Sequence, residues 1–158
     1  MAGDDFDLVA HIQDLQRNSE SGLALVTVAL VDEWLEKLLL TAMRELSNTV
    51  ATRLFETGPL QSFAAKADIA FAFRLIDAEL LAVLRILRDV RNRFAHTRVS
   101  IGFQSPDIDA LCQKLPGWKP SEDNERLFNV VAFDCVRTID AKTEELIFES
   151  ATDVKNDG

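Results

Sequence analysis

The sequence predicts an all-α protein folded as a single bundle of about six or seven helices. Two observations lead to this prediction. Apolar residues recur at helical spacing along most of the 158 residues, and the 6 glycines and 4 prolines fall between the periodic segments. Because there is no internal repeat, low-complexity tract or linker, we expect one helical domain over residues 1–152 and a polar tail over residues 153–158.

The N-terminal half predicts three helices. A short amphipathic helix over 4–17 precedes a break at 18–22, where Ser19 or Ser21 can cap the next helix. A long helix over 23–46 follows, and a short one over 50–55 leads into Gly58-Pro59. The apolar stripe of the long helix is wide enough to predict a central position in the bundle. Its members are Leu23, Val26, Leu30, Trp34, Leu38, Leu39, Leu40, Met43 and Leu46.

The C-terminal half predicts four more helices, over 62–75, 77–96, 105–115 and 122–148. Ser62 caps the first of them, acidic residues at 77 and 79 lie at the positive end of the second, and a proline opens the third. Residues 99–103 alternate as in a strand but have no partner strand. The expected core residues are Phe63, Ala67, Ala70, Phe71, Phe73, Leu75, Leu80, Leu84, Leu87, Val90 and Phe94, together with Trp34.

The chain is acidic, with a formal net charge of −9 that argues against extensive contact with nucleic acid. One segment differs: residues 85–98 hold five arginines and one acid, Asp89, and carry +4. A helix dipole or an ion-pair network with the acidic helix that contains Asp32, Glu33 and Glu36 would account for this charge. A phosphate site is the alternative, and its binding residues would be Arg85, Arg88, Arg93 and Arg98.

Arg91, Asn92 and His96 bring a guanidinium, an amide and an imidazole into six residues. Asn92 and His96 share a helix face because they are four apart. Arg91 and His96 lie about 140° apart on an ideal helix, so they converge only where the helix ends or distorts, or where two copies meet. His96 would move protons and Arg91 would stabilise a charged phosphorane, which suffices for metal-independent RNA cleavage. The alternatives are a helix cap for His96 and a buried amide for Asn92.

No pattern in the chain predicts a metal or cofactor. Cys112, Cys135 and the two histidines are scattered without metal-ligand spacing, and Asp32 and Glu36 lack the Glu-x-x-His partner of a di-iron site. The acidic N-terminus differs from a signal peptide, so we expect a cytoplasmic protein with free, buried thiols. The longest apolar run, residues 22–31, is too short to cross a bilayer.

Three blocks of the sequence resemble the mannitol repressor (MtlR-like) family. Residues 58–70, GPLQSFAAKADIA, are similar to its signature G-P-L-x-S/D-F/L-S-x-K/R, apart from Gln61 where the family often has Gly. The resemblance continues through residues 87–96 and 103–112 and covers roughly residues 23–115. It implies an all-helical bacterial regulator that is associated with repression of sugar-alcohol uptake genes and lacks an obvious DNA-binding motif. Sugar specificity does not transfer with it.

The block from Arg91 to His96 also resembles the R-x4-H motif of HEPN domains, which are small helical bundles and often dimers. Many of them are metal-independent ribonucleases in which Arg and His from two protomers form one cleft. The resemblance covers Arg91, Asn92 and His96 alone.

Three functions therefore stay open. The first is a mannitol-repressor-like regulatory module that acts through a protein partner. The second is a HEPN-type endoribonuclease with RNA bound at residues 85–98, and the third is an antitoxin-like or structural helical partner. A homodimer is expected because the wide apolar stripes exceed what one bundle covers.

Overall fold

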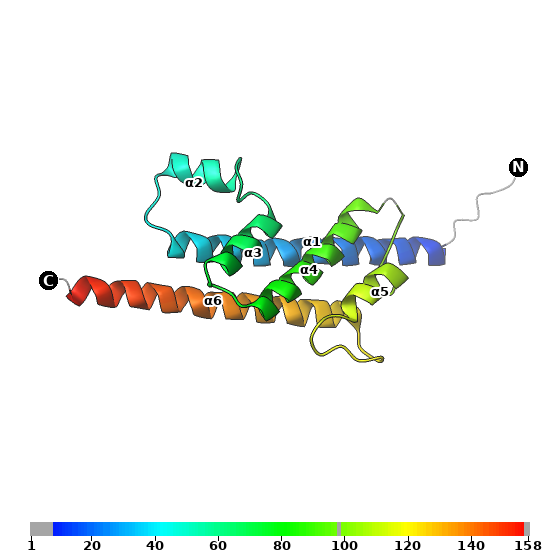
Figure 1. Ribbon diagram of the computed structural model, residues 1–158. Helices are drawn as coiled ribbons and strands as arrows, with labels where there is room; N and C mark the ends of the chain where they lie inside the picture. The colour runs from blue at the N-terminus through cyan, green and yellow to red at the C-terminus, as the bar shows by residue number, and fades with distance from the viewer. Residues whose placement is uncertain (1–7, 98, 157–158) are drawn as a thin grey trace, which may run out of the picture.

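The computed structural model describes the backbone of residues 8–97 and 99–156, and the side chains of residues 19–152 apart from residue 98. These residues form six α-helices and no strand (Figure 1), so the predicted all-α class is confirmed. Residues 99–103, which alternate like a strand in sequence, lie in the connection between the fourth and fifth helices. The helices are α1 (Leu8–Ala42), α2 (Asn48–Phe55), α3 (Phe63–Ala72), α4 (Ala78–His96), α5 (Pro106–Cys112) and α6 (Asn124–Asn156).

The first and last helices lie side by side and run in the same direction (Figure 1). Thr27 Oγ1 on α1 donates a hydrogen bond to Asn129 Oδ1 on α6 at 3.0 Å. Ten residues further along α1, Lys37 Nζ lies 3.7 Å from Asp140 Oδ1. At equal rise per residue, the end of α1 at Ala42 falls beside about residue 145 of α6. The last turns of α6 therefore extend beyond α1.

Helices α3, α4 and α5 form a second layer across this pair (Figure 1). Helix α4 is the middle of that layer, because it packs against α1, α3, α5 and α6. The core lies between the layers. Its largest fully buried side chains are Phe103, Phe128, Leu35, Leu38, Leu39, Leu84, Leu87, Ile108, Ile139, Val28, Val31 and Val90.

The predicted starts of the second-layer helices are confirmed by their caps. Ser62 Oγ accepts a hydrogen bond from the Ala65 amide at 3.2 Å, and Asp77 Oδ1 accepts one from the Leu80 amide at 2.8 Å. Each cap satisfies an amide that has no partner inside its helix. Ser105 precedes Pro106 at the start of α5, but its hydroxyl accepts the amide of Gly102 instead of an amide of its own helix.

The predicted break at residues 18–22 is wrong, because α1 runs through it without interruption. Glycine inside a helix costs only about 1 kcal/mol relative to alanine. Contacts with the rest of the protein outweigh that cost: Glu20 Oε2 accepts the Phe103 amide at 2.6 Å, and Ala24 is fully buried. Neither Ser19 nor Ser21 therefore begins a helix.

The buried face of α1 is rotated about the helix axis relative to the predicted apolar stripe. Val26 is 70% exposed and Leu23 is also exposed, whereas their neighbours Ala24 and Val28 are buried. The reason is that α1 packs against three helices, α3, α4 and α6. The positions of these neighbours determine which residues of α1 are buried, and a single apolar stripe does not predict them. Leu38 and Leu39 are buried as predicted.

Two of the predicted core phenylalanines lie at the surface. Phe63 is buried, but Phe73 is 71% exposed and Phe71 is also exposed. Helix α3 ends at Ala72, earlier than expected, and Arg74 has a positive φ of 60°. This turn takes Phe73 off the buried face of the helix.

Helix α6 is longer than the sequence pattern predicts. The pattern ends near residue 148, yet the helix continues to Asn156 and includes most of the predicted polar tail. Polar helical turns carry no periodic apolar signal, so the sequence pattern ends before the helix does.

Candidate functional site

Helix α4 presents the arginine-rich segment. Its apolar stripe is buried as predicted, with Leu84, Leu87 and Val90 fully inaccessible and Phe94 nearly so. Phe94 makes an edge-to-face contact with Phe103, with 5.1 Å between the two ring centroids. The arginines occupy the remaining sides of the same helix, so the core fixes where they lie.

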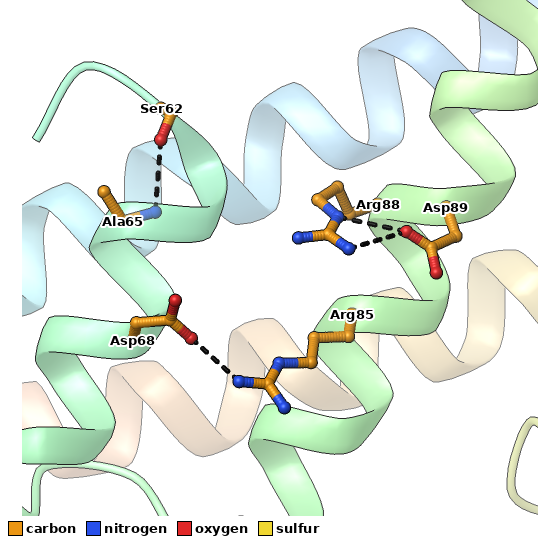
Figure 2. A network of polar contacts seen from close by, with 6 residues as sticks. All are labelled: Ser62, Ala65, Asp68, Arg85, Arg88 and Asp89. Atoms are coloured by element: carbon orange, nitrogen blue, oxygen red, sulfur yellow. Dashed lines mark hydrogen bonds and ion pairs between the residues drawn. The ribbon is translucent and has the colours of Figure 1, made fainter.

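Two of these arginines bridge α4 to its neighbours in the layer. Arg85 Nη2 lies 3.1 Å from Asp68 Oδ1 on α3, and Figure 2 shows the two side chains pointing toward one another. Arg93 Nη1 lies 3.5 Å from Asp107 Oδ2 on α5. All four side chains are more than half exposed, so each pair contributes little to stability.

Arg88 turns back to its own helix. Its Nε and Nη2 atoms lie 3.1 Å and 2.8 Å from Oδ1 of Asp89, the one acid of the segment (Figure 2). The predicted partners in α1 are wrong, because Asp32 and Glu36 bind Lys66 instead. Three arginines of the segment therefore pair with acids, and these acids are Asp68, Asp89 and Asp107.

Arg91 and Asn92 are in direct contact. Arg91 Nη1 donates a hydrogen bond to Asn92 Oδ1 at 3.0 Å, and both side chains are partly exposed. Asn92 is one turn before His96, which is exposed in the last turn of α4. The amide thus links the guanidinium to the helix face on which His96 lies. His96 is not buried against Asp32 or Glu36, and Asn92 does not lie buried between two helices.

Chemically, this end of α4 offers the guanidinium donors of Arg91 near the exposed imidazole of His96. Arg91 keeps donors beyond the one used for Asn92 and can bind an oxyanion through them. An exposed imidazole can give or take a proton. Arg98, the fifth arginine of the segment, lies outside the described residues.

An ion triad that the sequence analysis missed joins α3 to α1. Lys66 is 3% exposed, and its Nζ lies 2.8 Å from Glu36 Oε2 and 3.0 Å from Asp32 Oδ2. Burial lowers the pKa of this ammonium, but the hydrogen bonds and charges of Glu36 and Asp32 outweigh burial and raise the pKa above 10.5. The sequence does contain a signal for the buried position of Lys66. Phe63, Lys66 and Ala70 recur at helical spacing, which places the lysine on the buried face of the helix.

A second polar junction ties the start of α6 to the α4–α5 connection. Asn124, which is 2% exposed, donates through Nδ2 to the Phe103 carbonyl at 3.1 Å and to Asp109 Oδ1 at 2.8 Å. Glu20 holds the amide of the same Phe103. Burial, followed by the charges of Glu20 and Asp123, raises the pKa of the nearby Glu125.

The free thiols of Cys112 and Cys135 are buried, as predicted. Burial, with a smaller effect of a neighbouring aspartate, raises the pKa of each to about 12. Across residues 19–152, no three metal-ligating side chains gather closely enough to hold an ion. None of the helices, as far as their residues are described, combines the length and the apolarity that crossing a bilayer requires.

Comparison with protein-family models, with curated proteins and with solved structures finds no significant match. The resemblances to the mannitol repressor family and to HEPN domains therefore stay predictions from the sequence.

Proposed function

We propose that this protein is a cytoplasmic regulatory module of the mannitol-repressor-like kind, which acts on transcription through a protein partner and not by reading DNA itself. The observation that carries the proposal is the pairing of the arginine segment. Arg85, Arg88 and Arg93 each lie against a carboxylate of their own chain. These carboxylates reduce the net positive charge that the segment presents to phosphates, and the net charge of −9 opposes DNA binding further.

The arrangement of the three family-like blocks supports the same proposal. Residues 58–70 lead into α3, residues 87–96 form the second half of α4, and residues 103–112 contain α5. Helix α4 packs against both α3 and α5, so the blocks form one contiguous layer. The resemblance thus covers a structural unit and not three isolated stretches.

Transcript profiles of the host test the regulatory role. Deletion of the gene should change a defined set of transcripts, and the wild-type gene should restore them. The purified protein alone should not shift DNA from the responding promoters at about 150 mM salt, because a net charge of −9 opposes binding to a polyanion. A matched control replaces Arg85, Arg88 and Arg93 with alanine, and it should behave like wild type in the DNA assay.

Two results would contradict the proposal. If no transcript changes on deletion, the protein is not a transcriptional regulator. If the purified wild-type protein binds promoter DNA tightly and the binding weakens steeply with salt, the protein reads DNA directly. In that case the alanine variant should lose the binding.

A HEPN-type endoribonuclease is the second candidate, and the contact between Arg91 and Asn92 favours it. This contact joins the guanidinium to the face that carries the exposed His96. In this function His96 takes the proton from the 2′-hydroxyl or donates a proton to the leaving oxygen. Arg91 stabilises the negative charge on the non-bridging oxygens of the phosphorane.

RNA incubated with the purified protein in EDTA tests this candidate. Cleavage should persist in EDTA, disappear in His96→Ala and continue in Gln104→Ala, an exposed change outside the arginine segment. Cleavage that is unaffected by His96→Ala would come from a contaminant or another site. Absence of cleavage by the wild-type protein would remove the ribonuclease and leave the regulator.

A further inference from the structure

Helix α6 carries an unpartnered stripe of side chains on the side that faces neither α1 nor α4. Phe133 and Phe148 are 55% and 72% exposed, and Arg137, Ala141 and Glu144 are exposed as well. At 3.6 residues per turn, these five positions fall within roughly 80° around the helix axis. We call this set the α6 stripe. The contact with α1 uses Asn129 and Asp140, which lie on one flank of the α6 stripe, within about 40° of Phe133 around the helix axis.

Within the described residues, α6 packs mainly against α1, with smaller contacts to α4 and α5, and no other helix covers the α6 stripe. Figure 1 shows the C-terminal half of α6 along the edge of the molecule, with no helix on its side away from α1. Two largely exposed phenylalanines on one stripe are an unfavourable arrangement for a surface that stays in water.

The positions of the stripe are symmetric about one point, with two phenylalanines and two opposite charges at equal distances from it. The midpoint between Arg137 and Glu144 is also the midpoint between Phe133 and Phe148, since both fall between residues 140 and 141. A two-fold axis at that point would pair Phe133 with the partner's Phe148 and Arg137 with the partner's Glu144. Each pair would occur twice, as a two-fold interface requires.

A parallel arrangement lacks this complementarity. In that arrangement Arg137 would face the partner's Arg137 and Glu144 would face the partner's Glu144, and like charges in contact oppose association. Arg137 also pairs with Asp134 of its own helix. Its side chain remains 79% exposed, and a guanidinium has five donors, so it can bind a second carboxylate.

We infer that the protein forms a homodimer in which α6 packs antiparallel against α6 of a second copy along the α6 stripe. The occupant is a second copy because one stripe supplies both halves of every pair. Ala141 lies next to the axis, where its small side chain lets the two helices approach closely. This inference does not depend on either proposed function.

Charge exchange tests the interface, with sedimentation equilibrium as the measurement. Wild type should be a dimer. Arg137→Glu should raise the dimer dissociation constant at least about tenfold, because both ion pairs become repulsive. Glu144→Arg should do the same, and an equimolar mixture of these two variants should dimerise again. Lys114→Glu, an exposed charge reversal outside the stripe, should leave the dimer unchanged.

Cross-linking tests the orientation. A mixture of the Phe133→Cys and Phe148→Cys variants should form a disulfide-linked heterodimer on mild oxidation, whereas Phe133→Cys alone should not. The native thiols do not interfere because both are buried. Every substituted residue is exposed, so circular dichroism should show unchanged helix content.

Each of three outcomes would overturn the inference. One is a wild-type monomer at about 100 μM. Another is a dimer that neither Arg137→Glu nor Phe148→Asp weakens, since it would use another face. The third is self-cross-linking of Phe133→Cys, which would indicate parallel helices.

Discussion

Lys66 and Glu36 are in direct contact between α3 and α1, with 2.8 Å between Nζ and Oε2. We predict that Lys66→Met destabilises the protein, because Glu36 and Asp32 then face one another without a cation. Removing one partner of a fully buried pair costs about 3–5 kcal/mol. Both carboxylates here are about one-third exposed, so solvent screening reduces the expected loss to about 1–3 kcal/mol in urea denaturation.

The control variant is Lys37→Met, which removes a half-exposed partner of Asp140 and should cost less than about 1 kcal/mol. Equal losses in the two variants would contradict a special role for the triad.

The Lys66 triad also predicts a pH dependence. The folded-state pKa of Lys66 lies above its ordinary value of 10.5. A raised pKa on a cation gives stability that is complete below pH 10.5 and is lost as pH rises through the folded-state value. The difference in unfolding free energy between wild type and Lys66→Met should therefore be constant from pH 7 to 9 and shrink above pH 10.5. A difference that grows at alkaline pH would show that the ammonium is not stabilised by the carboxylates.

Two glycines should respond oppositely to alanine. A Cβ at Gly58 would lie 1.8 Å from the backbone oxygen of Arg53, so Gly58→Ala must displace the turn after α2. A Cβ at Gly22 would meet nothing within 4 Å inside α1. We expect Gly58→Ala to lower the melting temperature, whereas Gly22→Ala should stabilise by about 0.5–1 kcal/mol. Destabilisation by Gly22→Ala would indicate that α1 is not helical at this point.

The two thiols should be inert in the folded protein. Burial raises the pKa of Cys112 and Cys135 to about 12, so almost no thiolate exists at pH 8. Labelling with a disulfide reagent at pH 8 should be slow in buffer and should reach two thiols per chain in denaturant. Fast stoichiometric labelling without denaturant would place at least one of these residues at the surface.

Asn124 should tolerate neither truncation nor charge. Asn124→Ala removes the donor to the Phe103 carbonyl and to Asp109 Oδ1, and we expect a loss of about 1–3 kcal/mol. Asn124→Asp keeps the shape but places a carboxylate against two acceptors, so it should be the less stable variant at pH 7. Below about pH 4 the aspartate is protonated and can donate again, which should narrow the gap between the two variants. Chemical denaturation at pH 7 and below about pH 4 measures the difference in unfolding free energy between the two variants. A difference that does not depend on pH would argue against the hydrogen bonds to Phe103 and Asp109.

Local signals were sufficient to predict the second layer of the fold from the sequence. Ser62 and Asp77 cap helices where the pattern expects them, and the stripe from Leu84 to Phe94 is buried. The errors in α1 come from long-range contacts, whereas the exposure of Phe73 follows from the early end of α3. Glu20 bonds to a residue 83 positions away and so stabilises α1 across the expected break. Val26 is exposed because of which helices pack beside it, which no local window contains.

The sequence predicts which residues form the candidate site, but it does not predict which residues they contact. Arg91, Asn92 and His96 lie together at the end of α4 because their spacing is local. The partners of Arg85 and Arg93 come from α3 and α5, and a sequence pattern cannot choose among 26 acids. The sequence allows Asp32 and Glu36 as one possible set of partners for the arginines, but in the fold both carboxylates contact Lys66.

The parallel pair formed by α1 and α6 determines the order in which the chain can complete its structure during synthesis. Thr27 and Asn129, which bond across this pair, are 102 positions apart. Helix α1 is synthesised before α6, and the four other helices of the described residues lie between them in the chain. Until α6 is made, the side of α1 that packs on α6 stays uncovered, and closing so long a loop slows folding. A chain that lacks α6 would therefore expose the apolar side of α1, which favours aggregation and proteolysis.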